Sequence, residues 1–241
     1  MGSWAVMRHS HQTAKNPMTS FNLHKQKFKT AFRQILSEGD SYEIGEAALP
    51  AYAHPNPLID WLFWERIRVA YDFAGSREGG QNVLDFGCGS GVLSYLLAQD
   101  GCSVTACDVN FGPLDVVREK VAFPSSIEFV EGDILAGGLK EGSFDVIFAL
   151  DVLEHISDLD PYVVEFRRLL KPDGVVVVSG PTENLFYKIG RRLAGNRFTG
   201  DYHVTNIAHV KAAFEREMRV TILKKLLFPV VLFEVFIARP E

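Results

Sequence analysis

Cysteine is scarce in this chain of 241 residues, and the three that occur, Cys88, Cys102 and Cys107, show no C-x-x-C spacing. An odd number of cysteines without paired spacing argues against a disulfide framework and against a structural zinc site. Reactive thiols need an electropositive setting, whereas Cys88 lies in a glycine-rich turn where a small side chain suffices. We therefore expect a cytoplasmic protein without a cysteine nucleophile.

Long apolar runs and an excess of positive charge are also missing. The most apolar stretch, residues 226–238, is interrupted by Pro229 and Glu234, so no transmembrane segment is predicted. The formal net charge of −5 gives no reason to expect nucleic acid as a partner. Residues 1–17 lack the apolar core of a signal peptide, and we interpret them as a leader or a disordered tail.

A glycine-rich turn is the feature around which the chain is organised. Residues 83–86 predict a buried strand, Gly87-Cys88-Gly89-Ser90-Gly91 a tight turn, and residues 92–98 a helix. Glycine tolerates positive φ and lets a ligand approach the backbone, and a helix N-terminus favours an electron-rich group. The G-x-G-x-G spacing differs from the G-x-G-x-x-G of nicotinamide dinucleotide sites. Such a turn alone also serves as an ordinary connector.

Strand and helix patterns alternate from residue 82 to residue 178, which predicts an α/β fold with a parallel sheet covered on both faces. The expected strands are 82–86, 103–107, 127–131, 144–150 and 175–178, and the expected helices between them are 91–99, 112–122 and 160–170. In the last helix, Asp160 is the expected N-cap and Pro161 the first helical residue. A turn is expected over residues 171–174.

The end of the chain breaks this alternation. Residues 218–227 and 230–238 are both rich in β-formers, and only Phe228-Pro229 separates them. That connection is too short for a parallel crossover, so the two strands should pair in antiparallel fashion.

Residues 18–78 are expected to form an N-terminal helical cap. Apolar residues recur at helical spacing over 21–36 and 58–73, with a proline-containing linker over 51–57. On the second helix, Trp61, Trp64 and Arg68 fall on one side. Packing against the main domain is the simpler interpretation, and roofing a site for an apolar or flat substrate is the alternative.

Three acidic residues follow successive strands of the predicted sheet. Asp108 ends the second strand, where a carboxylate can accept hydrogen bonds from both hydroxyls of a ribose. Asp133 follows the third strand, in reach of an exocyclic amine, and Asp151 follows the fourth. Each alone could be a loop cap. Together with the glycine turn they outline a nucleoside with a polar tail.

These motifs resemble, in order, those of class I S-adenosylmethionine-dependent methyltransferases, above all the small-molecule group similar to ubiquinone and menaquinone methyltransferases (methyltransferase type 11). The matching segments are 83–91, Asp108, 132–134, 144–156 and 169–174, within about residues 80–180. The resemblance implies a methyltransferase domain over 79–241. It also implies a Rossmann-like doubly wound sheet of seven strands, ordered 3-2-1-4-5-7-6 with the last strand antiparallel.

The resemblance further implies S-adenosyl-L-methionine as cofactor and S-adenosyl-L-homocysteine as product. The cofactor-binding residues expected from it are Asp85, Gly87, Cys88, Gly89, Gly91, Asp108, Val109, Asp133, Ile134, Leu150 and Asp151. The glycines would pass the methionine arm, and Asp85 and the chain near Asp151 would meet its amino group. Asp108 would hold the ribose, while Asp133 and the Ile134 backbone would meet the adenine.

No motif of the resemblance identifies the acceptor side. Methyl transfer from a sulfonium is an in-line displacement, so a base is needed only if the acceptor must lose a proton. His155 is the first candidate base and His203 the second, although a histidine in the context of His155 can also simply pack. Asp151, Glu154 and His155 would share a face of one helical turn, but three ligands from one turn seldom suffice, so no metal is predicted.

Residues 181–205 are expected to form a lid inserted in the methyltransferase domain. The segment has arginines, lysines and glycines but no acid from 184 to 200. A solvated basic surface is one interpretation, and recognition of an acidic acceptor or peripheral contact with an anionic membrane is the other.

The sequence thus predicts methyl transfer to a small-molecule acceptor, acidic or apolar, with O-methylation ahead of C- or N-methylation. A non-catalytic nucleotide-binding regulatory protein of the same fold and an NAD-dependent reductase are the alternatives.

Overall fold

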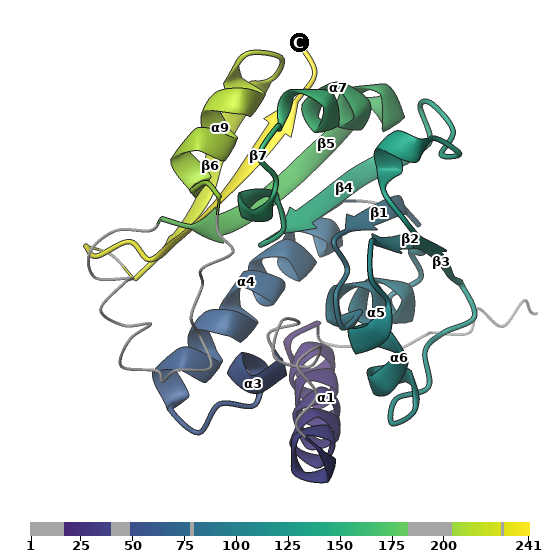
Figure 1. Ribbon diagram of the computed structural model, residues 1–241, viewed down its shortest axis with the longest axis vertical. Coiled ribbons are helices and arrows are strands. Elements are labelled where there is room, and N and C mark those ends of the chain that lie inside the picture. Colours follow the sequence, from purple (N-terminus) through teal and green to yellow (C-terminus); the bar gives the residue numbers. More distant parts are fainter. Residues whose placement is uncertain (1–16, 40–48, 78–79, 183–203, 228) are drawn as a thin grey trace, which may run out of the picture.

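The computed structural model describes residues 17–39, 49–77, 80–182, 204–227 and 229–241, and they build one seven-stranded sheet (Figure 1). Its order is β3-β2-β1-β4-β5-β7-β6, as expected. The strands are β1 (Asn82–Phe86), β2 (Ser103–Asp108), β3 (Ile127–Glu131), β4 (Phe144–Leu150), β5 (Leu170–Pro181), β6 (Arg219–Leu226) and β7 (Phe233–Arg239). Strands β1 to β5 are parallel, and β7 runs antiparallel to both β5 and β6.

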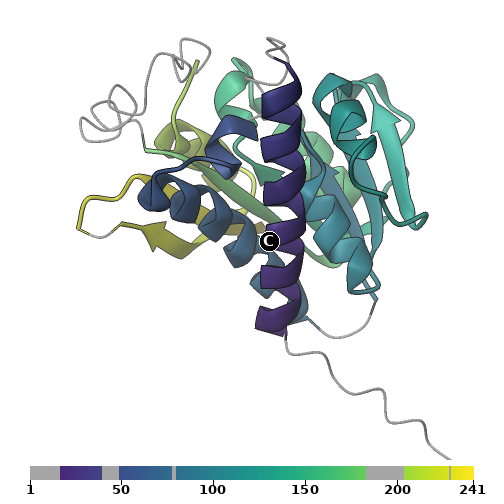
Figure 2. The same ribbon diagram turned by 90° about the horizontal axis from the view of Figure 1, so that it is seen from below.

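Helices cover both faces of the sheet (Figures 1 and 2). The described helices are α1 (Pro17–Glu38), α3 (Leu49–Tyr52), α4 (Pro57–Gly75), α5 (Val92–Gln99), α6 (Gly112–Arg118), α7 (Asp160–Leu169) and α9 (Ile207–Glu215), with 3₁₀ turns η1 (Ile134–Ala136) and η2 (Leu153–His155). Side chains alternate between the faces: Val146 joins the core under α1, α4, α5 and α6, while Ile147 joins the core under α7 and α9. This double burial explains the near-continuous apolar run of β4.

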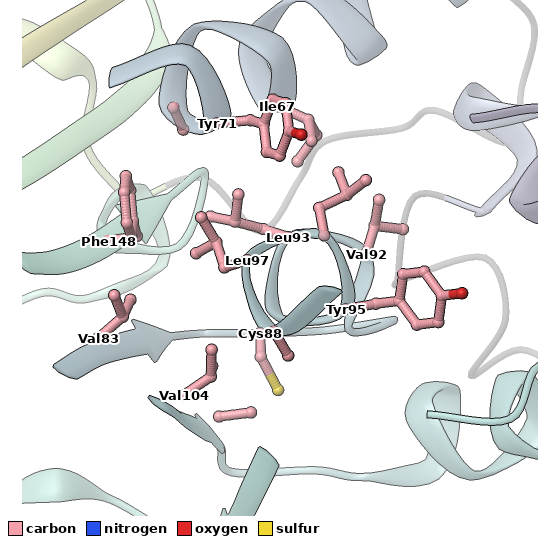
Figure 3. Packing of buried hydrophobic residues seen from close by; sticks show 14 of the residues in the cluster. Ile67, Tyr71, Val83, Cys88, Val92, Leu93, Tyr95, Leu97, Val104 and Phe148 are labelled. Carbon is pink, nitrogen blue, oxygen red and sulfur yellow. The ribbon is translucent and has the colours of Figure 1, made fainter. Parts of the chain in front are cut away.

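The N-terminal helices share one core with the sheet. Phe28 of α1 and Trp64 of α4 belong to the same buried cluster as Val83 and Phe148 of the strands. Figure 3 shows α5 between α4, which contributes Ile67 and Tyr71, and the strands. The helices of residues 18–78 therefore pack on a face of the sheet as well as against one another.

Of the three residues expected on one side of α4, Trp61, Trp64 and Arg68, only Trp64 packs into the core. Trp64 is 2% exposed and its ring nitrogen donates to the Tyr52 carbonyl at 3.0 Å. Trp61 is 40% exposed, and Arg68 pairs with Glu65 and Asp72 on the outside of the helix. The packing interpretation is therefore the one that Trp64 supports.

Several expected boundaries are wrong. The linker over 51–57 begins later, because Leu49–Tyr52 forms a helical turn before the prolines. The helix that starts at Gly112 ends at Arg118 instead of residue 122. Residues 171–174 lie within β5 as an irregularity, since its register with β4 shifts between Phe144 and Val146.

The helix caps differ as well. Asp160 is the first residue of α7, Leu159 is its N-cap, and the Asp160 carboxylate instead pairs with Arg216 beyond α9. Helix α9 was not expected, although Asn206 caps it by accepting from the amides of Ala208 and His209. Among the described helices, none combines the length and the apolar character that a bilayer crossing requires.

Candidate functional site

The glycine turn is held against the end of β2. The amides of Gly87 and Cys88 both donate to the Cys107 carbonyl, at 2.8 and 3.1 Å. Gly87, Gly89 and Gly91 have φ of 72°, 51° and 72°, in the left-handed region that glycine adopts most readily. The backbone therefore favours glycine at all three positions.

The surroundings separate the three glycines into two kinds. A Cβ on Gly87 would lie 2.4 Å from a methyl group of Val152, and one on Gly91 would lie 2.8 Å from Leu114 and Phe123. A Cβ on Gly89 would meet no atom of the described chain within 4 Å. Gly87 and Gly91 are thus fixed by packing, and Gly89 alone presents its backbone to open space, where a ligand can approach.

Asp108 connects three loops at this edge of the sheet. Its Oδ2 accepts from the Gly89 amide at 2.8 Å and its Oδ1 accepts from the Asn110 amide at 3.2 Å. Its carbonyl accepts from the Gly132 amide at 2.8 Å, so the loop after β3 is tied to the same residue. Because a carboxylate has about four acceptor positions, Asp108 keeps capacity for ligand hydroxyls. Its neighbour Val109 is 69% exposed.

Asp133 lies beside these loops and caps η1. Its Oδ1 accepts from the Leu135 amide at 2.9 Å, and its Oδ2 accepts from the Tyr162 hydroxyl at 2.6 Å. Burial, together with this hydrogen bond, raises the pKa of Tyr162 to about 12, so the phenol stays a donor. Asp133 is therefore a loop cap, and a ligand amine would use its remaining lone pairs. Ile134, next in the chain, is 2% exposed.

Asp85 lies beneath the turn and is 3% exposed. Burial raises its pKa to about 6; hydrogen bonds from Ser94 act against this rise, and the charge of Asp108 adds to it. The Ser94 hydroxyl donates to Asp85 Oδ2 at 2.5 Å and is itself fully buried. Ser94 was not expected at the site, although it is the one small polar residue inside the apolar helix 92–98.

Asp151, directly after Leu150 at the end of β4, adopts a φ of 53°, which is unusual for a non-glycine residue. Its amide donates to the Ser179 carbonyl at 3.0 Å, and the Ser179 hydroxyl donates to its Oδ1 at 3.1 Å. Its Oδ2 forms an ion pair with Arg66 of α4. Arg66 was missed in the sequence, where it is one of three neighbouring charges, Glu65, Arg66 and Arg68, and nothing marks it as the buried one.

Glu154 and His155, which a regular helical turn would have placed on one face with Asp151, point in different directions. η2 is a 3₁₀ turn in which Glu154 is 2% exposed whereas His155 faces solvent, so the two side chains do not share a face. Within the described ranges no group of three His, Cys, Asp or Glu side chains could hold a metal ion.

The expected lid is described only at its ends. The Glu154 carbonyl accepts from the amides of Val204 and Thr205, at 2.9 and 3.2 Å, so the chain returns beside η2. His203 and residues 183–203 lie outside the described residues.

Cys88 is a buried free thiol. Burial raises its pKa, and the charges of Asp85 and Asp108 raise it further, so the thiol stays protonated. Cys88 contributes its amide to the turn and is unsuited to nucleophilic attack.

The loops after β1, β2 and β4 thus bring together a bare glycine backbone and carboxylates. Tyr52 of α3 lies close enough to Asp85, Asp151 and Arg66 for their charges to act on its phenol, whose pKa burial raises to about 12. Such a site suits a ligand that offers hydroxyls, an amine and a positive charge.

Comparisons with known proteins point to one family. Residues 84–178 match the family described as methyltransferase domain. The chain is 32% identical over 164 residues to a malonyl-[acyl-carrier protein] O-methyltransferase of Serratia marcescens, covering 66% of this chain and 62% of that protein. It is 39% identical over 143 residues to a ubiquinone biosynthesis O-methyltransferase of Pseudomonas aeruginosa, covering 56% and 57%. The chain therefore spans less than two thirds of the length of either relative.

A solved structure has the same fold. The N-methyltransferase NodS of Bradyrhizobium japonicum, in complex with S-adenosyl-L-homocysteine, superposes with a TM-score of 0.57 at 18% identity. The match covers 87% of this chain and 98% of NodS.

Proposed function

We propose that this chain, whose residues 84–178 belong to the methyltransferase-domain family, is an S-adenosylmethionine-dependent methyltransferase acting on a small molecule. The observation that carries the proposal is the junction at Asp108. The Asp108 carboxylate accepts a hydrogen bond from the turn after β1, and the Asp108 backbone carbonyl accepts one from the loop after β3. At that junction Gly89 offers its backbone to open space.

Each residue then has a role in cofactor binding. Asp108 accepts from the ribose hydroxyls, and Asp133 and the Ile134 backbone meet the adenine. The turn at Gly89 passes the methionine arm, while Asp85, Leu150 and Asp151 surround its amino group. Gly87 and Gly91 shape the turn through their packing, Cys88 lends its amide, and Val109 lies at the ribose side.

The bound cofactor supplies a methyl group already activated on a sulfonium, so the chain has to align the acceptor and exclude water. We favour O-methylation, because both relatives described above, at 32% and 39% identity, are O-methyltransferases by name. An oxygen acceptor that loses a proton needs a base. His155, in η2 after β4, is the first candidate and His203 is the second. The acceptor we favour is acidic or apolar, under an N-terminal cap of residues 18–78.

We further propose a cytoplasmic location, supported by three cysteines that are all buried free thiols. Residues 181–205 are proposed as a lid, with peripheral membrane contact as a secondary possibility for its basic side chains.

Transfer of an isotope-labelled methyl group tests the activity. The full chain is incubated with S-adenosylmethionine labelled in the methyl group and with fractionated small-molecule extracts, and products are followed by mass spectrometry. We expect a labelled product that requires the protein and disappears with excess S-adenosylhomocysteine. If S-adenosylhomocysteine binds but no fraction yields a labelled product, the chain is a non-catalytic binding protein of this fold.

A further inference from the structure

Arg66 occupies an unusual place for a charged side chain. It lies in the middle of α4 and is 3% exposed. Its guanidinium carbon is 4.1 Å from the ring centre of Phe63 and 4.3 Å from that of Phe233, so an aromatic ring from α4 and one from β7 both contact it. A buried charge of this kind is costly unless a partner compensates it. Here the partner is Asp151 Oδ2.

The partner has its own constraints. Asp151 is held in a left-handed conformation at φ 53°, which non-glycine residues seldom adopt. Such a conformation persists where the surroundings over-determine it. Ser179 binds both the amide and Oδ1 of Asp151, and Arg66 binds Oδ2, so both carboxylate oxygens are fixed.

The Asp151 side chain is nevertheless 22% exposed. A carboxylate that is fixed on one side and partly open on the other can accept one more donor. Arg66 is too deeply buried to contact a ligand, so it can act on one through its ion-pair partner Asp151.

We infer that Arg66 is a positioning residue. It orients the Asp151 carboxylate toward the ammonium group of the cofactor's amino acid arm and so couples the N-terminal helix α4 to the loop after β4. This inference rests on the proposed function, because it assigns a chemical partner to a residue of the same site.

The inference makes a distinction between two ligands. S-adenosylhomocysteine carries the amino acid arm, whereas 5′-methylthioadenosine shares the nucleoside and the thioether but lacks that arm. A residue that merely stabilises the fold would affect both ligands alike. A residue that acts through Asp151 on the ammonium group should affect only the first.

The test is calorimetric titration of both ligands into the full chain and its variants. Arg66→Met keeps an apolar side chain between the two rings, and we expect it to weaken S-adenosylhomocysteine binding about tenfold or more, the equivalent of one lost charged contact. Binding of 5′-methylthioadenosine should change by less than about twofold, well under 1 kcal/mol. Asp151→Asn should show the same selectivity, and the double variant should lose no more than the larger single loss.

Arg68→Met is the matched control. Arg68 lies on the same helix, pairs with Glu65 and Asp72, and has 36% of its side chain exposed. Its loss should leave the preference for S-adenosylhomocysteine unchanged. If Arg66→Met does not fold, Arg66→Lys and Asp151→Asn carry the comparison, and each should lower that preference.

Equal weakening of both ligands by Arg66→Met, or unchanged or tighter binding of S-adenosylhomocysteine, overturns the inference. So does an unchanged preference in either Arg66→Lys or Asp151→Asn. A wild-type chain that binds neither ligand overturns the proposed function instead.

Discussion

The amide of Gly89 donates to the carboxylate of Asp108 at 2.8 Å, which makes the turn after β1 and the end of β2 a single structural unit. The same carboxylate is the expected partner of a ribose. Asp108 therefore has two tasks, shaping the glycine turn and accepting ligand hydroxyls, and substitutions can separate them.

Asp108→Asn should weaken S-adenosylhomocysteine binding by about 10- to 100-fold, the equivalent of a charge-assisted hydrogen bond of about 1.5–3 kcal/mol. The amide oxygen of asparagine can still accept from Gly89, so most of the turn is retained. Asp108→Ala removes both tasks and should weaken binding further. Calorimetry measures both, and an affinity unchanged in Asp108→Ala would refute the role.

Gly89→Ala and Gly91→Ala form a matched pair. At Gly89 the new Cβ meets no protein atom, so we expect a stability loss of only about 1–2 kcal/mol from the positive φ, together with loss of ligand binding. At Gly91 the Cβ would press on Leu114 and Phe123, which adds about 1–3 kcal/mol of overpacking.

Denaturant unfolding and calorimetry on both glycine variants give the comparison. A Gly89→Ala variant that binds S-adenosylhomocysteine as well as the wild type does would show that no ligand passes over this backbone.

Asp85→Asn should stabilise the protein near neutral pH. The pKa of Asp85 is raised from 3.8 to about 6 by burial, so the folded state binds a proton more tightly than the unfolded state does. The stability from this proton is fully present below about pH 4 and is lost as the pH rises through about 6. Asparagine does not titrate and avoids the cost of a buried charge.

The free energy of unfolding of Asp85→Asn relative to wild type should therefore rise by up to about 3 kcal/mol between about pH 4 and about pH 7. Urea titrations at several pH values measure it. A difference that does not vary with pH would mean that Asp85 is not the group whose pKa is raised.

His155→Gln tests the assignment of the base. If His155 takes a proton from the acceptor, kcat should fall by about 100-fold or more while the affinity for S-adenosylhomocysteine stays the same. His203→Gln, measured in parallel, shows which of the two histidines carries this step. Unchanged kcat in His155→Gln would leave it as a surface residue of η2.

The sequence predicted the sheet well because the core imposes its own pattern. Doubly buried strands such as β4 need continuous apolar runs, and parallel crossovers need helices between them. The short connection at Phe228-Pro229 was enough to predict the antiparallel pair. The positions of the acids at strand ends followed from the same periodicity, because the carboxyl ends of parallel strands share one edge.

What the sequence could not predict depends on contacts between distant segments. The pairs Arg66–Asp151 and Tyr162–Asp133 join residues whose proximity exists only in the folded chain. The prediction that Asp160 is the N-cap was wrong for the same reason, because its carboxylate pairs with Arg216. In contrast, α9 could have been predicted, because Asn206 is a good N-cap and the apolar residues Ile207, Val210 and Phe214 follow it at helical spacing.

The local geometry of η2 was also beyond a periodicity argument. Spacing of three and four residues places side chains on one face only in a regular α-helix. The positive φ of Asp151 begins a 3₁₀ turn instead, which buries Glu154 and exposes His155.

The most direct test of the central claim is a calorimetric titration of the unmodified chain with S-adenosylhomocysteine, with NAD titrated in parallel. The account predicts saturable binding of one molecule of S-adenosylhomocysteine per chain and no heat from NAD. Binding of NAD without binding of S-adenosylhomocysteine would contradict it.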